Sequence, residues 1–289
     1  ILSILNFTKM NSFMKFLIKS LLLIPFIVIS DEGLNIIEIS YGDHEKQKID
    51  FYKGSSDKVL IWIHGGGWLY GDKRADRWIQ RFQNHFVDHE EFNVFMIGYR
   101  IGEGTAPHAV DDVLCAYKRI INEITINNLS KEDIIIAGAS AGGHLALMLG
   151  FSDNYKNKSC LFNTKPKAVI NLFGITDLQG TSDFLDKTKF FKASNYVKRW
   201  IPKDKSLKEE SIYLSPINLV NDDSPAVMTI HGTEDRWVPF NQATLLDKKL
   251  NEKHKLLTIE GGGHYFFTDD EDVTIRKNIS IFLKDNYSK

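Results

Sequence analysis

A serine, an aspartate and a histidine of this 289-residue chain have the types and the order of a catalytic triad. Ser140 is the centre of the pentapeptide G-A-S-A-G at 138–142, between an apolar run and a segment of small residues. A serine hydroxyl becomes a good nucleophile only when a base removes its proton and a third group orients that base. Asp235 and His264 each follow an apolar run and a glycine. Serine, acid, histidine is one chain order in which such triads occur, so these residues are the predicted nucleophile, acid and base.

A glycine run earlier in the chain could stabilise the negative oxygen that forms when a serine attacks a carbonyl. The sequence H-G-G-G-W at 64–68 follows the apolar run 59–63. Glycines leave backbone N–H groups accessible, and such groups form oxyanion holes. We predict a hole built from the N–H groups of Gly66 and Gly67 and that of Ala141, the residue after the serine.

Other polar residues near these motifs have competing interpretations. Glu234 or Asp177 could be the acid in place of Asp235. We interpret three further histidines as structural, or as ordering the glycine loop, rather than as bases: His64, His144 and His231. Because no set of His, Cys, Asp and Glu has metal-ligand spacing, we predict neither a metal nor another cofactor.

Strands and helices must alternate to position these residues. Apolar runs predict strands at 34–40, 48–52, 59–63, 92–98, 134–137, 168–173, 226–230 and 256–259, of which the first two form an antiparallel edge. Helical spacing predicts helices at 74–89, 110–124, 141–149, 240–250 and 275–283. This alternation predicts an α/β fold with a mostly parallel sheet of about eight strands and helices on both faces. Loops at the carboxyl ends of such strands carry the site.

Residues 178–215 interrupt the alternation and are predicted to form a small cap-like insertion. Within 187–205, Arg199 and several lysines stand beside aromatic residues. These aromatic residues are Phe190, Phe191, Tyr196 and Trp200. The segment is either a cap that admits anionic or aromatic substrates or a solvated surface cap. Trp68, Leu69 and Tyr70 follow the glycine loop and are predicted to wall the acyl or alcohol pocket, with Trp68 and Tyr70 binding substrate, although aromatic side chains there could equally belong to the core.

Residues 1–30 are predicted to be a leader. After Met14, two lysines precede the apolar run 21–29, and Ser30 lies at the polar boundary, as in a secretory signal peptide. The run is short for a membrane span, although an uncleaved anchor or an artefactual leader is the alternative. Residues 31–289 are then a catalytic domain, secreted or periplasmic, with no stable membrane insertion after cleavage.

Charge and cysteine content limit the remaining possibilities. The formal net charge is −1 and no extended basic run occurs, so nucleic acid is not an expected partner. Cys115 and Cys160 are the two cysteines. A bridge between them is possible, but we predict buried free thiols, because Cys115 falls inside an amphipathic helix.

Together these motifs resemble the esterase/lipase branch of the α/β-hydrolase superfamily, and more narrowly its feruloyl-esterase-like and acetyl-esterase-like members, which are related to hormone-sensitive-lipase-like esterases. The resemblance covers about residues 35–285. The segments that carry it are 64–73, 98–100, 138–146, 215–216, 231–235 and 263–264. The resemblance implies an α/β-hydrolase fold and the activity of a serine carboxylesterase. Such an enzyme would cleave small-molecule esters, either short or sugar-linked, through an acyl-enzyme. Alanine at 139 departs from the G-D-S-A-G form of hormone-sensitive-lipase-like enzymes, and the insertion is short for a lipase lid.

Two other functions compete with the esterase. Aryl formamidases that act on N-formylkynurenine pair an H-G-G motif with the same triad, but the leader argues against that intracellular pathway. A non-catalytic binding protein of the hydrolase fold generally lacks a triad member, whereas all three residues are present here.

Overall fold

The computed structural model describes residues 36–74, 86, 91–157, 160, 162–188, 195–264 and 268–287. They belong to one structural unit, Asn35–Lys289. The predicted leader lies outside the described residues, as does nearly all of the predicted helix 74–89. Among the helices that are described, none is both long enough and apolar enough to cross a membrane.

Eight strands form one sheet, in the order β1-β2-β4-β3-β5-β6-β7-β8. They are β1 (Ile36–Ser40), β2 (Lys48–Tyr52), β3 (Val59–Ile63), β4 (Asn93–Ile97), β5 (Ile134–Ala139), β6 (Ala168–Leu172), β7 (Ala226–Gly232) and β8 (His254–Ile259). β2 pairs antiparallel with β1 and β4, and all other neighbours are parallel. The predicted α/β-hydrolase fold, with its antiparallel edge, is confirmed.

The burial of the strands explains their composition. Every residue of β3, β4, β5 and β6 is buried. Strands covered on both faces read as continuous apolar runs, which is why these four could be predicted from sequence. At the edge of the sheet, β1 buries only Ile39 fully.

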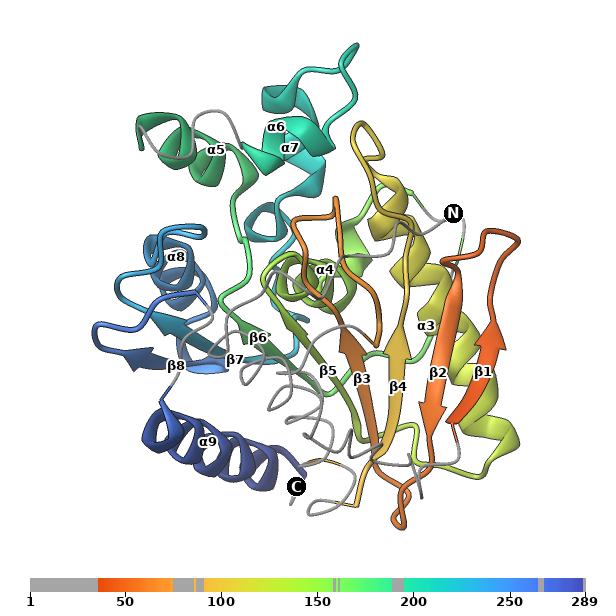
Figure 1. The fold of residues 1–289 in the computed structure, drawn as a ribbon. Helices are drawn as coiled ribbons and strands as arrows, with labels where there is room; N and C mark the ends of the chain where they lie inside the picture. The colour runs from red at the N-terminus through yellow and green to blue at the C-terminus, as the bar shows by residue number, and fades with distance from the viewer. Residues whose placement is uncertain are drawn as a thin grey trace, which may run out of the picture. The chain divides into compact units, whose positions relative to one another are not determined.

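Helices cover the two faces of this sheet. They are α3 (His108–Ile126), α4 (Ala141–Gly150), α8 (Asn241–Leu250) and α9 (Asp269–Tyr287). Figure 1 shows α3 and α4 behind the sheet and α9 in front of it. All of α4 except its last residue is buried, because the helix packs against β5, β6 and α3. The segment after Ser140 is therefore held in the core of the protein.

The insertion between β6 and β7 contains α5 (Leu178–Lys187), α6 (Tyr196–Trp200) and α7 (Leu207–Leu214). Figure 1 places these helices beyond the carboxyl ends of the parallel strands. Val197 and Trp200 of α6 are fully buried. The described part of the insertion thus packs on the domain at the end where the catalytic loops were predicted.

The prediction of free thiols is wrong, because Cys115 and Cys160 form a disulfide with their Cα atoms 4.9 Å apart. The segment after α4 folds back over α3. There Tyr155 and Asn157 both donate hydrogen bonds to Asp111 Oδ1. These contacts, between residues far apart in the chain, bring Cys160 to Cys115, and helix periodicity alone could not reveal them.

Candidate active site

Ser140 lies on the turn between β5 and α4 and has a strained backbone. Its φ of 56° and ψ of −121° are rare for a residue with a side chain. The Ser140 N–H donates to Leu172 O of β6, and the Ser140 carbonyl accepts the first backbone hydrogen bond of α4, from His144 N. Hydrogen bonds on both sides of the turn therefore hold the strained conformation.

The two glycines of the pentapeptide are required by close backbone packing. A Cβ on Gly138 would lie 2.2 Å from Gly142 O, and a Cβ on Gly142 would lie 2.1 Å from Ile63 O at the end of β3. No side chain fits at either distance. The turn at Ser140 packs tightly against the end of its own strand, β5, and against the end of the neighbouring strand, β3. The two glycines of the G-x-S-x-G pattern make this close packing possible.

Ser140, His264 and Asp235 form a continuous hydrogen-bonded chain. His264 Nε2 lies 3.0 Å from Ser140 Oγ, and His264 Nδ1 lies 2.7 Å from Asp235 Oδ2. Each of the three residues is only 5% exposed. With the ring proton on Nδ1, His264 donates to Asp235 and can accept the serine proton at Nε2. The arrangement can therefore deprotonate the Ser140 hydroxyl.

Asp235 is fixed by backbone donors and by a second histidine. Its Oδ1 accepts from the N–H groups of Trp237 and Val238 at 2.8 and 2.9 Å. Its Oδ2 lies 3.3 Å from Nε2 of the buried His231, which is also bonded to Val238 O. Burial opposes ionisation, but hydrogen bonds from His231 and His264 outweigh it and hold the pKa of Asp235 well below its usual range.

The alternative acids lie elsewhere. The Glu234 side chain is exposed, although it is the sequence neighbour of Asp235. Asp177 is the N-cap residue of α5, and its N–H donates to Gln242 Oε1. Asp235 is the carboxylate bonded to His264.

The glycine loop after β3 adopts a conformation that needs glycine. Gly66 and Gly67 have φ values of 117° and 60°. A Cβ on Gly66 would lie 2.0 Å from Tyr70 O, because Tyr70 N–H donates to Gly66 O and closes the turn. Both glycines line one pocket with Ser140 and His264.

Ala141, the third predicted donor, is the first residue of α4. The N–H groups in the first turn of a helix have no intrahelical partner, and the helix dipole makes that end positive. Helix α4 therefore presents its N-terminal N–H groups beside Ser140. Of the three predicted oxyanion donors, Gly66 and Gly67 line the pocket with Ser140, and Ala141 follows Ser140 at the start of α4.

His64 orders the beginning of the glycine loop. Its Nδ1 is 2.7 Å from Gly65 O, and its ring stacks on that of Tyr99 with centroids 4.2 Å apart. The Tyr99 hydroxyl donates to His64 O. Burial lowers the pKa of His64 to about 4, so the imidazole is neutral near neutral pH.

Trp68 does not line the pocket, and its predicted substrate contact is wrong. The side chain is 0% exposed and stacks on Trp200 of α6 with ring centroids 4.3 Å apart. Its Nε1–H donates to His144 Nδ1 at 3.2 Å. Because Trp68 has a φ of 60°, the loop turns the indole into the core. Tyr70, by contrast, is 61% exposed and does line the pocket.

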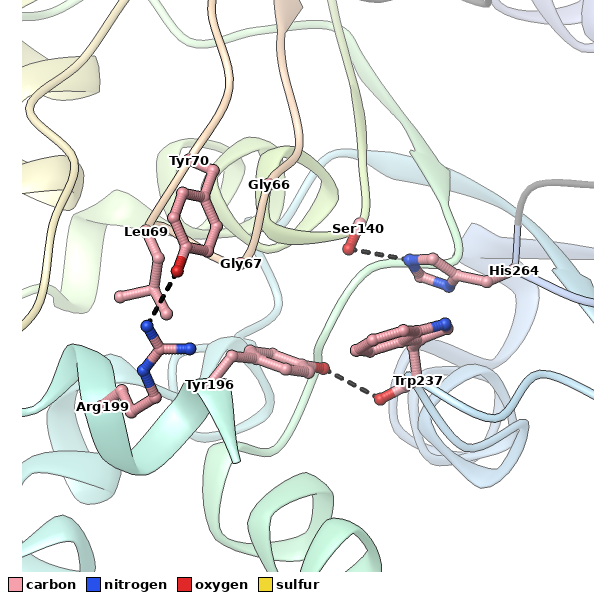
Figure 2. A pocket seen from close by; sticks show the side chains of 9 residues that line it. All are labelled: Gly66, Gly67, Leu69, Tyr70, Ser140, Tyr196, Arg199, Trp237 and His264. Atoms are coloured by element: carbon pink, nitrogen blue, oxygen red, sulfur yellow. Dashed lines mark hydrogen bonds between the residues drawn. The ribbon is translucent and has the colours of Figure 1, made fainter. Parts of the chain in front are cut away.

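Figure 2 shows the pocket, which has a volume of about 320 Å³. The floor is formed by Ser140, His264, Gly66 and Gly67. The walls are formed by Leu69, Tyr70, Tyr196, Arg199 and Trp237.

The sequence had indicated four of these wall residues, Leu69, Tyr70, Tyr196 and Arg199, but not the fifth. Tyr196 and Arg199 belong to the aromatic and basic stretch of the insertion, whereas Trp200 from the same stretch is buried in the core. Trp237 was not predicted. The sequence feature that could have indicated it is its position two residues after Asp235. The Tyr196 hydroxyl donates to Trp237 O at 2.9 Å, and this bond joins the insertion to the loop that carries Asp235.

Residues 49–250 match the BD-FAE family. The chain belongs to the BD-FAE family. The match runs from β2 through α8, so it includes Ser140 and Asp235 but ends before His264.

The BD-FAE chain is similar to curated proteins named as esterases. It is 24% identical over 250 residues to "Esterase LipC" of Mycobacterium tuberculosis, which covers 79% of this chain and 59% of that protein. It is 26% identical over 219 residues to "Probable carboxylic ester hydrolase LipM" of the same organism, covering 71% and 49%. The chain thus spans about half of the length of these relatives.

Solved structures share the fold of the BD-FAE chain. The structure titled "Truncated form of carbohydrate esterase from gut microbiota" superimposes with a TM-score of 0.70 at 22% identity. The superposition covers 87% of this chain and 95% of that one. At this identity the likeness establishes the α/β-hydrolase architecture.

Proposed function

We propose that the protein is a carboxylic ester hydrolase that uses Ser140 as nucleophile, His264 as base and Asp235 as the orienting acid. One observation carries the proposal: the hydrogen-bonded chain from Ser140 Oγ through His264 to Asp235 lies at the floor of a mostly apolar pocket. Membership of the BD-FAE family and similarity to proteins named as esterases support the same reaction.

The reaction proceeds in two steps. Ser140 Oγ attacks the ester carbonyl carbon while His264 Nε2 takes the hydroxyl proton, and the carbonyl electron pair moves onto its oxygen. The N–H groups of Gly66, Gly67 and Ala141 hold this oxyanion. The bond to the alcohol then breaks, and His264 returns the proton to the leaving oxygen. Water, deprotonated by His264, cleaves the acyl-enzyme and regenerates Ser140.

Asp235 acts through His264. The carboxylate stays ionised and keeps the ring proton on Nδ1, so Nε2 faces Ser140 as an acceptor. When His264 takes the serine proton, the buried negative charge stabilises the imidazolium.

The pocket supports small esters, including sugar-linked ones, as substrates. Its volume of about 320 Å³ lies at the lower end of the range of ligand pockets. Tyr70 and Trp237, 61% and 39% exposed, present aromatic faces on which a ring of the alcohol part could pack. The proposed partner is therefore a small-molecule ester.

We also propose that the domain, residues 31–289, works outside the cytoplasm. Disulfides persist in oxidising compartments and are rare in the cytosol. The Cys115–Cys160 bridge therefore supports export, for which residues 1–30 would be the leader.

Ester hydrolysis by the full chain tests the proposal. The wild type should release 4-nitrophenol from 4-nitrophenyl acetate, and Ser140→Ala should lose about 10³-fold or more of that rate. Ser152→Ala, which changes a serine in the short turn after the end of α4, is the matched control. Retained turnover in Ser140→Ala contradicts the mechanism. Faster cleavage of N-formylkynurenine than of any ester favours a formamidase instead.

A further inference from the structure

The pocket has two chemically different ends. Figure 2 shows Ser140 and His264 toward one end and Arg199 with Tyr70 toward the other, with the Tyr196 side chain extending between them. Of the described residues that line the pocket, Arg199 is the one with a permanent positive charge. The triad chemistry needs no positive charge at this place.

At the Arg199–Tyr70 end of the pocket, the hydrogen bonds that are formed leave N–H and O–H groups available to a ligand. Arg199 Nη2 donates to the Tyr70 hydroxyl oxygen at 2.8 Å. Because that oxygen accepts from a cation, the hydroxyl hydrogen is directed elsewhere and can be donated to a ligand. Figure 2 shows the other terminal nitrogen of Arg199 turned toward Tyr196, along the pocket wall.

The acid that pairs with Arg199 stands outside the pocket. Glu103 Oε1 accepts from Arg199 Nε at 2.9 Å and from Nη2 at 2.7 Å. The Glu103 side chain is 61% exposed. Among the described residues, Glu103 is not part of the pocket lining. Arg199 and Tyr70 therefore present hydrogen-bond donors to the pocket, while the carboxylate of Glu103, which balances the charge of Arg199, faces solvent.

From this arrangement we infer that the Arg199–Tyr70 end binds a carboxylate carried by the ester substrate. A guanidinium and a phenolic hydroxyl are donors, and a carboxylate supplies several acceptor positions and a complementary charge. The inference rests on the proposed esterase function, which it narrows to esters with an acidic group remote from the scissile carbonyl. We call the Arg199–Tyr70 end of the pocket the subsite. Glu103 reduces the preference for acidic over neutral esters, because it offsets the charge of Arg199 without occupying the subsite.

Two pairs of esters distinguish where the carboxylate lies. The acyl pair is mono-4-nitrophenyl glutarate and 4-nitrophenyl valerate. The alcohol pair is 4-acetoxybenzoate and its methyl ester. In the pair that matches the subsite, kcat/KM of the wild type should be higher for the acid by about tenfold, as expected for a partly solvated charge-assisted bond.

Variants link this preference to the subsite. Arg199→Leu should reduce the acid-to-neutral ratio of kcat/KM about tenfold, and Tyr70→Phe should reduce it less. Glu103→Gln should raise the ratio, because the charge of Arg199 is then no longer offset. Lys198→Leu is the matched control, since Lys198 is the neighbouring cation on α6 and pairs with Asp186. Ratios are taken within one preparation, so a lower folded fraction cancels.

Binding of 4-hydroxybenzoate and of its methyl ester provides a readout that needs no turnover. Tighter binding of the acid, lost in Arg199→Leu but kept in Lys198→Leu, supports the subsite even if no ester is cleaved and the esterase proposal fails. Equal ratios in both ester pairs, together with acid binding that Arg199→Leu does not weaken, overturn the inference while leaving the esterase intact.

Discussion

Trp68 Nε1 donates a hydrogen bond to His144 Nδ1 at 3.2 Å, and this bond joins the glycine loop to helix α4, which follows Ser140. The other ring nitrogen, His144 Nε2, lies 2.7 Å from Leu214 O at the end of α7. One fully buried imidazole thus connects the glycine loop, helix α4 and the insertion. The bond to Trp68 is a positioning contact, since neither ring touches the pocket.

Removing the Trp68–His144 hydrogen bond should weaken stabilisation of the transition state more than it weakens substrate binding. In Trp68→Phe the stacking surface on Trp200 is largely kept, but the donor to His144 is lost, and an unmatched buried acceptor costs about 1–3 kcal/mol. We expect kcat to fall about tenfold with little change in KM. Affinity for a boronic acid analogue of the tetrahedral intermediate should weaken in parallel with kcat. A variant that loses stability but keeps kcat and analogue affinity shows that the contact is only structural.

The buried histidines should make the fold acid-sensitive. Burial lowers the pKa of His64 and of His144 to about 4. An unfolded imidazole titrates near 6.5, so between about pH 6.5 and 4 the unfolded chain binds protons that the folded chain excludes. The free energy of unfolding should therefore fall as the pH drops through this window, by up to about 3 kcal/mol for each histidine.

Urea unfolding across that pH window measures the effect. His144→Asn keeps a side-chain acceptor but has no titratable ring, so its free energy of unfolding should fall less with acid than that of the wild type. Identical slopes in the two proteins contradict the assignment for His144.

Asp235 should be necessary for catalysis, and its neighbour Glu234 should not. The amide of Asp235→Asn can donate to His264 Nδ1, which places the ring proton on Nε2 and prevents acceptance from Ser140. We expect kcat to fall about 10⁴-fold with the fold intact. Glu234→Gln, at the exposed adjacent position, should keep wild-type kcat. The reverse pattern identifies Glu234 as the acid.

The glycine loop, which we propose holds the oxyanion, should tolerate no side chain at Gly66. A Cβ there meets Tyr70 O at 2.0 Å, so Gly66→Ala must displace the N–H groups of the loop. We expect a loss of about 10²-fold or more in kcat. Gly261→Ala is the control, since Gly261 also has a positive φ, 71°, but its Cβ meets nothing within 4 Å. If both variants lose the same activity, backbone strain rather than the glycine loop is responsible.

The sequence sufficed for the sheet and the order of the motifs, because both depend on local patterns. Apolar runs marked β3, β5, β7 and β8, and the chain direction of parallel strands placed the loops after them at one edge. For this reason Ser140, Asp235 and His264 could be predicted as neighbours although they lie far apart in the chain.

Contacts between distant segments could not be predicted in the same way. Trp68 directly follows the glycines of the glycine loop, yet a positive φ turns its side chain into the core. Cys160 reaches Cys115 only because the intervening segment folds back over α3. Trp237 reaches the pocket wall through the turn after Asp235. Each outcome depends on backbone direction or tertiary packing, which residue spacing does not encode.

Covalent labelling with a fluorophosphonate tests the central claim most directly, because the reagent reacts with a serine activated by a base and an oxyanion hole. The account predicts one adduct per folded chain, located at Ser140 by peptide mapping. His264→Ala should abolish it, as should unfolding before addition of the probe. No adduct on the folded wild type, or an adduct at a different serine, contradicts the account.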